Sequence, residues 1–282
     1  MYTRAYKTLI TIPPLIWVTT FLLLPYAFLF AYSFWSVTPD QTIVHQWQLG
    51  NYFELIRNPL YFEVLLRSIR IAASVTVIAI GLGFPLAYFL SFHCHKHKTL
   101  IYQLVIIPLW VSYLVRAYAW KTILGSTGVL NTLLIYFHVI QQPASFLLYS
   151  PFAVILTLIH IYTPFTFLPI YASLEHIPRN LVEASHDLGA TPWQTFRRVI
   201  LPLSMPGLIA GGTFAFVLSL GDFFSPLLIG GPTGIMISNI VYSVFGAAYN
   251  WPLGAAISLC MLLLVITLLQ TTEKLERRWT FS

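Results

Sequence analysis

Long apolar runs alternate with short polar segments along the whole chain. Six runs are each about as long as the roughly 20 residues that an α-helix needs to cross about 30 Å of hydrocarbon. They cover residues 9–34, 68–90, 100–120, 152–172, 203–228 and 253–269. The pattern predicts an all-α, polytopic membrane protein with six transmembrane helices.

The composition agrees with a membrane setting. Apolar residues make up 57% of the chain and charged residues only 9%, whereas soluble domains carry about 25% charged residues. An ordinary soluble enzyme and a disordered chain are therefore excluded. The two cysteines, Cys94 and Cys260, are too few for a disulfide framework, and we expect free thiols.

The basic residues predict the orientation. The first run follows Arg4 and Lys7 but is longer than the cleavable core of a signal peptide, so it should stay as an anchor. With both termini in the cytoplasm, ten of the fifteen Lys and Arg residues fall inside, as the positive-inside rule requires. The net charge of +6 then reports topology, and no nucleic-acid partner is expected.

Prolines interrupt most of the predicted spans, for example Pro85, Pro108 and Pro164. Each proline removes a backbone hydrogen bond, and in lipid the freed carbonyl must find another partner. Such kinks fit a protein that lines a path or moves. The alternative, that proline is simply commoner in membrane helices, stays open.

The segment 177–202 holds much of the charge and is punctuated like two short helices. Asn180 can cap the first, with Glu183 reaching back in a capping box, and Gly189 suits a left-handed C-terminal cap. One face of this helix would carry Leu181, Ala184 or Ser185, and Leu188, with Glu183, His186 and Asp187 turned toward water or a partner.

The second helix of this segment has its own start and stop signals. Thr191 and Gln194 form a capping box around Pro192, and Pro202 is expected to end the helix. A helix-turn-helix between two spans suits transmission of force from a soluble partner. An amphipathic pair lying on the lipid surface is the alternative, and physical reasoning alone leaves both open.

The same segment resembles the loop motif of permease subunits of bacterial ATP-binding-cassette (ABC) importers, between their fourth and fifth spans. The matching residues, with Ser in place of Ala and Val in place of Ile, are Glu183, Ala184, Ser185, Gly189, Val199, Leu201 and Pro202. The resemblance extends to the spermidine and putrescine permease group over nearly the whole chain. It includes residues 60–65, 108–121, 128–131, 187–190 and 251–256.

This resemblance implies a type I importer fold in the bacterial inner membrane. The loop would be a coupling helix that docks on an ATPase, with Asp187 and Ala190 in the shared segment. It also implies a second, related permease subunit, two ATPase subunits that hold ATP and Mg, and an external solute-binding protein. No cofactor is expected in this chain. A polyamine is the first expectation for the solute, and opines, other amines or iron stay open.

Asp222 is the one acidic residue inside a predicted span. A charge in the bilayer costs at least about 2.5–3.5 kcal/mol and should face a cavity or a partner. The carboxylate, together with nearby aromatic rings, could attract an amine. The candidates for the substrate path are Asp222, Arg116 and the aromatic residues Phe223, Trp110, Tyr113, Tyr118 and Trp120. Alternatively, Asp222 pairs with Arg116 or sits among headgroups, with the rings in an interfacial belt.

Other chemistry finds little support in the sequence. The tract His93, His95 and His97 has no acidic ligand beside it and is interpreted as a basic loop, so no metal site is expected. No P-loop lysine and no H-E-x-x-H helix is present. The rivals are an intramembrane hydrolase and, nearer, a secondary transporter acting alone. We divide the chain into residues 1–66, a core of 67–271 and a tail of 272–282.

Overall fold

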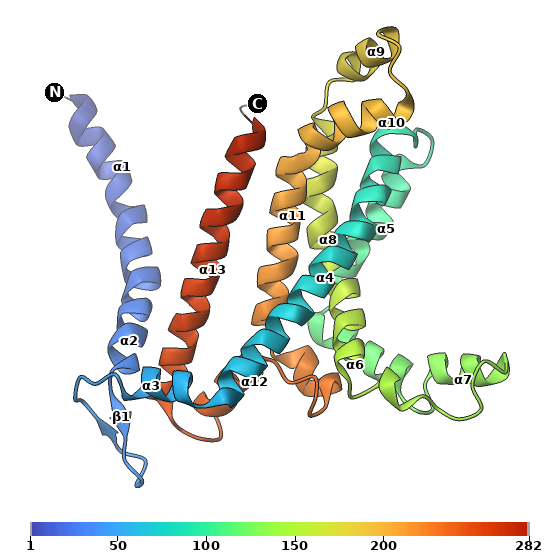
Figure 1. The fold of residues 1–282 in the computed structure, drawn as a ribbon. Coiled ribbons are helices and arrows are strands. Elements are labelled where there is room, and N and C mark those ends of the chain that lie inside the picture. The colour runs from blue at the N-terminus through green and yellow to red at the C-terminus, as the bar shows by residue number, and fades with distance from the viewer. Residues whose placement is uncertain (1, 281–282) are drawn as a thin grey trace. The chain divides into compact units, whose positions relative to one another are not determined.

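Helices form most of the chain in the computed structural model, which describes residues 2–280 apart from the side chains of residues 2–9, 275 and 278–280 (Figure 1). The first elements are α1 (Tyr2–Val18), the π-helix η1 (Thr19–Leu23), α2 (Leu24–Ser33), strands β1 (Ser36–Val37) and β2 (Ile43–Val44), α3 (Gly50–Arg57), α4 (Pro59–Phe92), α5 (Lys98–Trp110), α6 (Tyr113–Leu124) and α7 (Val129–Tyr136). The later elements are the 3-10 helix η2 (Ser145–Leu147), α8 (Pro151–Glu175), α9 (Arg179–Asp187), α10 (Pro192–Thr195), the π-helix η3 (Phe196–Ile200), α11 (Leu201–Gly221), the π-helix η4 (Pro226–Gly230), α12 (Ile237–Phe245) and α13 (Trp251–Thr280). Phe281 and Ser282 of the predicted tail lie outside the described residues.

The chain divides into two compact units. The first runs up to Phe62 and includes Ile240–Leu264, and the second takes Glu63–Asn239 and the residues from Val265 onward. In the first unit, β1 and β2 pair antiparallel, and the Asn51 side chain donates to the backbone carbonyls of Ser33 and Trp35 at 2.8 Å. The domain boundaries proposed from the sequence stay a prediction.

Membrane-length helices confirm the polytopic fold. Five helical segments are long and apolar enough to span a membrane: Ile10–Ser33, Pro59–Phe92, Pro151–Glu175, Pro192–Gly221 and Trp251–Lys274. Six spans result when the bent pair Lys98–Trp110 and Tyr113–Tyr136 is counted as one.

The third span is not the continuous helix over 100–120 that the sequence predicts. Its two halves bend by 96°, because Val111 leaves helical geometry with ψ near 133°. Pro108 lies three residues earlier and cannot donate to the carbonyl of Leu104, which weakens the last turn of α5. The break allows α6 to start in a new direction.

Pro202 does not end the second helix of the loop, so this prediction is wrong. The chain stays helical from Pro192 to Gly221 because η3 inserts a wider turn, in which the Leu201 N–H reaches the Phe196 carbonyl. A π-turn can relieve the clash between a proline ring and the carbonyl four residues back. The same arrangement occurs in the first span, where the π-helix η1 ends two residues before Pro25 and the chain continues as α2.

The centre of the second unit is the close pairing of α8 with α11. A Cβ atom added at Gly211 would lie 2.6 Å from the Thr166 carbonyl oxygen, and one at Gly207 would lie 2.6 Å from the Pro169 carbonyl oxygen. The two glycines are four residues apart and share one face of α11, as in the small-residue contacts of membrane helices. Only glycine permits this distance between the two backbones.

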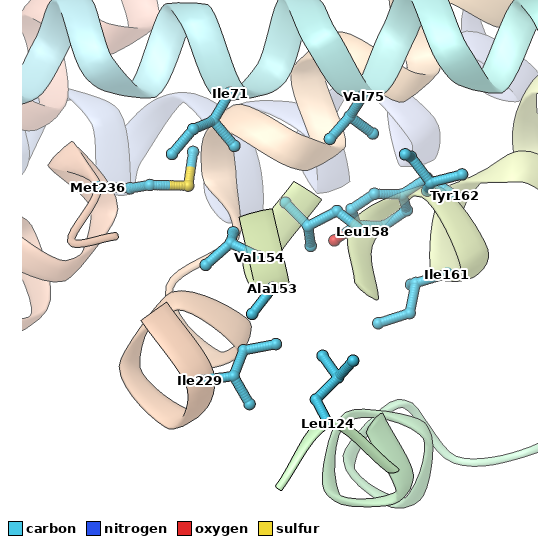
Figure 2. Packing of buried hydrophobic residues seen from close by; sticks show 11 residues of the cluster. Ile71, Val75, Leu124, Ala153, Val154, Leu158, Ile161, Tyr162, Ile229 and Met236 are labelled. Carbon is cyan, nitrogen blue, oxygen red and sulfur yellow. The ribbon is translucent and has the colours of Figure 1, made fainter. Parts of the chain in front are cut away.

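Two hydrophobic clusters lie along α8. One joins α4, α6, α8 and η4 and includes Ile71, Leu124, Leu158 and Ile229 (Figure 2). The other lies toward the opposite end of α8 and includes Phe167 and Leu174. One hydrophobic cluster therefore packs against the first half of α8 and the other against its second half.

Candidate functional site

The segment between α8 and α11 forms an exposed helical hairpin, made of α9 and α10, at one end of the second unit (Figure 1). Gly189 has a φ of +79°, which confirms the left-handed cap. The capping box of Thr191 and Gln194 is also confirmed, with Pro192 at the first helical position. The capping box assigned to Asn180 and Glu183 is wrong, because α9 begins at Arg179, after an N-cap at Pro178.

The two faces of α9 differ from the predicted arrangement. Leu181 and Leu188, expected on the packed face, are 44% and 89% exposed. Ser185 does lie on the packed side, as predicted, together with Val182, and the Ser185 hydroxyl lies 2.8 Å from that of Thr195 in α10. The hairpin is therefore closed by a polar contact and presents apolar side chains to the outside.

The hairpin is anchored on the end of α4. The Arg179 guanidinium donates to the Ser91 carbonyl at 3.3 Å. A cavity of about 390 Å³ lies between the hairpin and α4, and Tyr88, Glu183 and His186 are among its lining residues. Beside it, Lys98 and Glu175 form an ion pair at 2.6 Å that joins the start of α5 to the end of α8.

The remaining loop residues of the predicted motif lie on or beside this hairpin. Ala184 and Asp187 are exposed, and Ala190 donates its backbone N–H to the Ser185 carbonyl at 3.0 Å. Val199 lies in η3, and Leu201 and Pro202 open α11. The structure thus gathers the motif into one hairpin and the first turns of the following span.

Asp222 lies at the other end of α11, about 30 Å along the axis of this 21-residue helix. It is not inside a helical span, because its backbone is extended (φ −72°, ψ 118°) and α11 ends at Gly221. One carboxylate oxygen accepts the backbone N–H groups of Phe224 and Ser225, both at 3.0 Å. Asp222 therefore breaks the predicted fifth span and caps the turn that leads into η4.

Two tyrosines from other helices also bind this carboxylate. The Tyr113 hydroxyl of α6 lies 2.6 Å from each carboxylate oxygen, and the Tyr162 hydroxyl of α8 donates at 3.0 Å. The Ser225 hydroxyl donates at 3.2 Å. We call Asp222, Tyr113, Tyr162 and Ser225 the Asp222 cluster. With only 6% of Asp222 exposed, the charge is stabilised by fixed hydrogen-bond donors rather than by water.

Two polar side chains hold the backbone beside the cluster. The Ser238 hydroxyl donates to the Asp222 carbonyl at 2.6 Å. The Asn239 side-chain amide donates to the Phe223 carbonyl, also at 2.6 Å. These contacts fix the chain between α11 and η4 on both sides of the carboxylate, so the break in the span has a defined geometry.

Arg116 does not pair with Asp222. Among the described residues, the two form no ion pair. Arg116 is 9% exposed, its Nη1 lies 3.4 Å from the Ile161 carbonyl, and its Nε is buried with no hydrogen-bond partner. The pairing considered from the sequence is therefore not the arrangement in this structure.

The other candidate path residues are spread around this end. Tyr113 and Tyr118 contact the ring of Phe224, at centroid distances of 5.9 and 6.1 Å. Trp110 and Tyr118 have exposed rings, Phe223 is 41% exposed, and Trp120 contacts His160. Of the predicted set, only Tyr113 and Asp222 are hydrogen-bonded to each other, and the assignment of the others to a path stays a prediction.

Sequence reasoning missed four residues of this region: Tyr162, Ser225, Ser238 and Asn239. The spacing of Asp222 and Ser225, three residues apart before Pro226, was the available signal, since it is typical of a capped turn. This signal was overlooked because the apolar residues on both sides predict one continuous span. Tyr162 gave no comparable local signal, because its partner lies 60 residues away.

Membrane-length helices broken at defined points, with an exposed helical hairpin joined to the central helix pair, are typical of a membrane permease. The comparison with known families agrees. Residues 2–280 match the model of the binding-protein-dependent transport system inner membrane component. The chain belongs to this family, and it is a transport permease subunit of an ABC importer, not an enzyme.

Curated relatives show which members of the family the chain is similar to, and solved structures show its fold. The chain is 38% identical to the spermidine/putrescine transport system permease protein PotB of Escherichia coli (strain K12), covering 87% of this chain and 88% of PotB. It is 35% identical to PotB of Haemophilus influenzae, over 93% and 92% of the two chains. Its fold matches a bacterial alginate ABC transporter, solved with an alginate-bound periplasmic protein, with a TM-score of 0.79 at 19% identity over 98% and 96% of the chains. The type I importer fold is thereby confirmed.

Proposed function

We propose that this chain forms half of the translocation pathway of an importer for spermidine, putrescine or a closely related amine. The observation that carries the solute class is the 38% identity to a spermidine/putrescine permease over most of both chains. The fold is shared with transporters of unlike solutes, so it supports the mechanism but does not select the solute.

The α9–α10 hairpin is the element we assign to ATPase docking. It presents Leu188 and Trp193, which are 89% and 66% exposed, beside the acidic side chains of Glu183 and Asp187. Exposed apolar side chains rimmed by charge mark a protein interface. A soluble ATPase subunit, with ATP and Mg bound to it, would pull on this surface, and α10 would pass the movement directly into α11.

The remaining partners follow from the same proposal. A second, related permease subunit would complete the pathway, a second ATPase subunit would complete the motor, and an external binding protein would deliver the solute. The hairpin and both termini would be cytoplasmic. In support, Met205 at the start of α11 and Thr272 near the end of α13 line one pocket, which places the end of α13 on the hairpin side of the unit.

The Asp222 cluster suggests how one wall of the pathway is held. Asp222 is buried and accepts hydrogen bonds from three side chains and two backbone N–H groups, so we infer that it orders the wall. A solute amine would have to displace these donors to reach it. The exposed rings of Phe223, Tyr118 and Trp110 are the more accessible candidates for cation–π contact.

Uptake by the reconstituted complex tests this function. The permease is purified with its second permease and ATPase subunits, placed in liposomes with ATP inside, and supplied with the binding protein and radiolabelled spermidine or putrescine. We expect uptake that requires both ATP and the binding protein, and no hydrolysis by the isolated permease. ATP-driven uptake of a different solute, with neither amine transported or competing, would overturn the solute assignment and leave the importer assignment intact.

A further inference from the structure

The described residues bury one basic and one acidic side chain, Arg116 and Asp222, and the two contact consecutive residues of α8. Arg116 reaches the Ile161 carbonyl, and Asp222 accepts from the hydroxyl of Tyr162, the next residue. On α6, Tyr113 binds Asp222 and lies one turn before Arg116. The two opposite charges therefore share neighbours on two helices without touching.

The two charges are satisfied very unequally. The Asp222 carboxylate accepts from Tyr113, Tyr162, Ser225 and the backbone, whereas Arg116 has one long contact and an unpartnered Nε. A guanidinium carries five N–H donors, and leaving a buried cation unpaired is costly.

We propose that Tyr162 is a switch residue between two arrangements of this buried charge pair. In the first arrangement, seen here, the Tyr162 hydroxyl holds Asp222 and Arg116 keeps only the Ile161 carbonyl. In the second, the Tyr162 side chain turns away and the Arg116 guanidinium binds the Asp222 carboxylate directly. The exchange replaces a neutral donor with a charged one, whose hydrogen bonds to a carboxylate are stronger.

Each of the two helices has an interrupted hydrogen-bond ladder near the switch. The α5–α6 break of 96° lies just before Tyr113, and Pro164, which cannot donate a backbone hydrogen bond, lies two residues after Tyr162 in α8. A transport cycle requires elements with two discrete packed arrangements. The switch supplies such an element where α6, α8 and the end of α11 meet, and it does not depend on which solute is carried.

The test measures the distance between α6 and α8 in the assembled complex in nanodiscs. Spin labels are placed at Leu114 and Phe152, both exposed, in a chain without Cys94 and Cys260. Tyr162→Phe removes the donor that favours the first arrangement, and a hydrogen bond to a charged group should shift the equilibrium about tenfold or more. We expect a second distance population to dominate in this variant.

Arg116→Gln supplies the decisive combination. It removes the partner of the second arrangement, so Tyr162→Phe combined with Arg116→Gln should return to the wild-type distance, and Arg116→Gln alone should keep it. Tyr102→Phe is the matched control, because Tyr102 packs on Phe167 and Tyr171 in the other core cluster.

Two results would overturn the switch: an unchanged distance in Tyr162→Phe, or a shift that persists in the double variant. If Tyr162→Phe does not assemble, recovery of the complex on adding Arg116→Gln supports the proposal. Equal or greater loss in the double variant contradicts it, since a purely structural cluster predicts effects that add.

Discussion

The α9–α10 hairpin and the Asp222 cluster lie at opposite ends of α11, and different kinds of interaction build them. The hairpin is folded by short-range contacts, such as the capping box that joins Thr191 to Gln194, and a single long-range contact, from Arg179 to the Ser91 carbonyl, anchors it on α4. The cluster is held by side chains far apart in the chain, since Tyr113 and Asp222 are separated by 109 positions. The hairpin is thus formed mainly by local contacts, while the Asp222 cluster depends on tertiary contacts.

The two regions also differ in exposure. Leu188 of the hairpin is 89% exposed, whereas Asp222 is 6% exposed. Substitutions in the hairpin should therefore change what the permease binds and leave its helix bundle intact. Substitutions in the cluster should change the stability of the bundle first, because they leave buried donors without an acceptor.

The α8–α11 contact connects the two regions and should give the largest effect. Gly211→Leu places a side chain 2.6 Å from the Thr166 carbonyl and must push the helices apart. We expect a loss of about 3 kcal/mol or more and little assembled complex, measured by size-exclusion yield and thermal unfolding. Gly81→Leu in α4, where an added Cβ meets nothing within 4 Å, is the control and should assemble normally.

Asp222→Asn should destabilise the buried cluster. It keeps the size of the side chain but removes the charge that Tyr113, Tyr162 and Ser225 stabilise, at an expected cost of about 1–3 kcal/mol. The same change in the exposed hairpin, Asp187→Asn, should stay within about 0.5 kcal/mol. Equal melting temperatures for the two variants would contradict the contrast between the regions.

Gly189→Val should uncouple the hairpin without unfolding the bundle. A β-branched residue at a φ of +79° costs at least about 1–2 kcal/mol, so the turn between α9 and α10 should change its conformation. We expect weaker retention of the ATPase and reduced uptake at an unchanged melting temperature of the permease. Gly189→Asn should recover most of the coupling, since Asn tolerates this backbone region. Normal ATPase retention in Gly189→Val would remove support for the docking role.

Thr191→Ala should have the smallest effect. It removes the side-chain acceptor for the Gln194 N–H and costs about 1 kcal/mol of local helix stability. Hydrogen exchange of the α10 amides should speed up about fivefold, while Thr191→Ser should exchange like the wild type. Faster exchange that extends into the Asp222 cluster would show that the two regions are not independent.

The same contrast explains how far the sequence could predict the structure. The apolar runs predicted where the spans lie, but not the break at Val111 or the end of α11 before Asp222. The spacing around Gly189 and Thr191 predicted the caps, because these signals act within a few residues. The exposure of Leu181 and Leu188 was not predicted, because the side of the hairpin that packs is decided by the contact of Ser185 with α10. The environment of Asp222 depends on α6 and α8, and no local pattern encodes those contacts.

The central claim is that the hairpin is the ATPase-docking surface and that the other end of the unit is not. Photocrosslinking from single cysteines tests this directly, with Cys94 and Cys260 replaced and a reactive probe on Leu188→Cys or Phe146→Cys. Both wild-type residues are exposed. Phe146 lies in η2, just before the start of α8, whereas the hairpin follows the other end of α8. In the assembled complex, we predict that Leu188→Cys crosslinks to the ATPase subunit and that Phe146→Cys does not. Crosslinking of the ATPase from Phe146→Cys, with none from Leu188→Cys, would contradict the account.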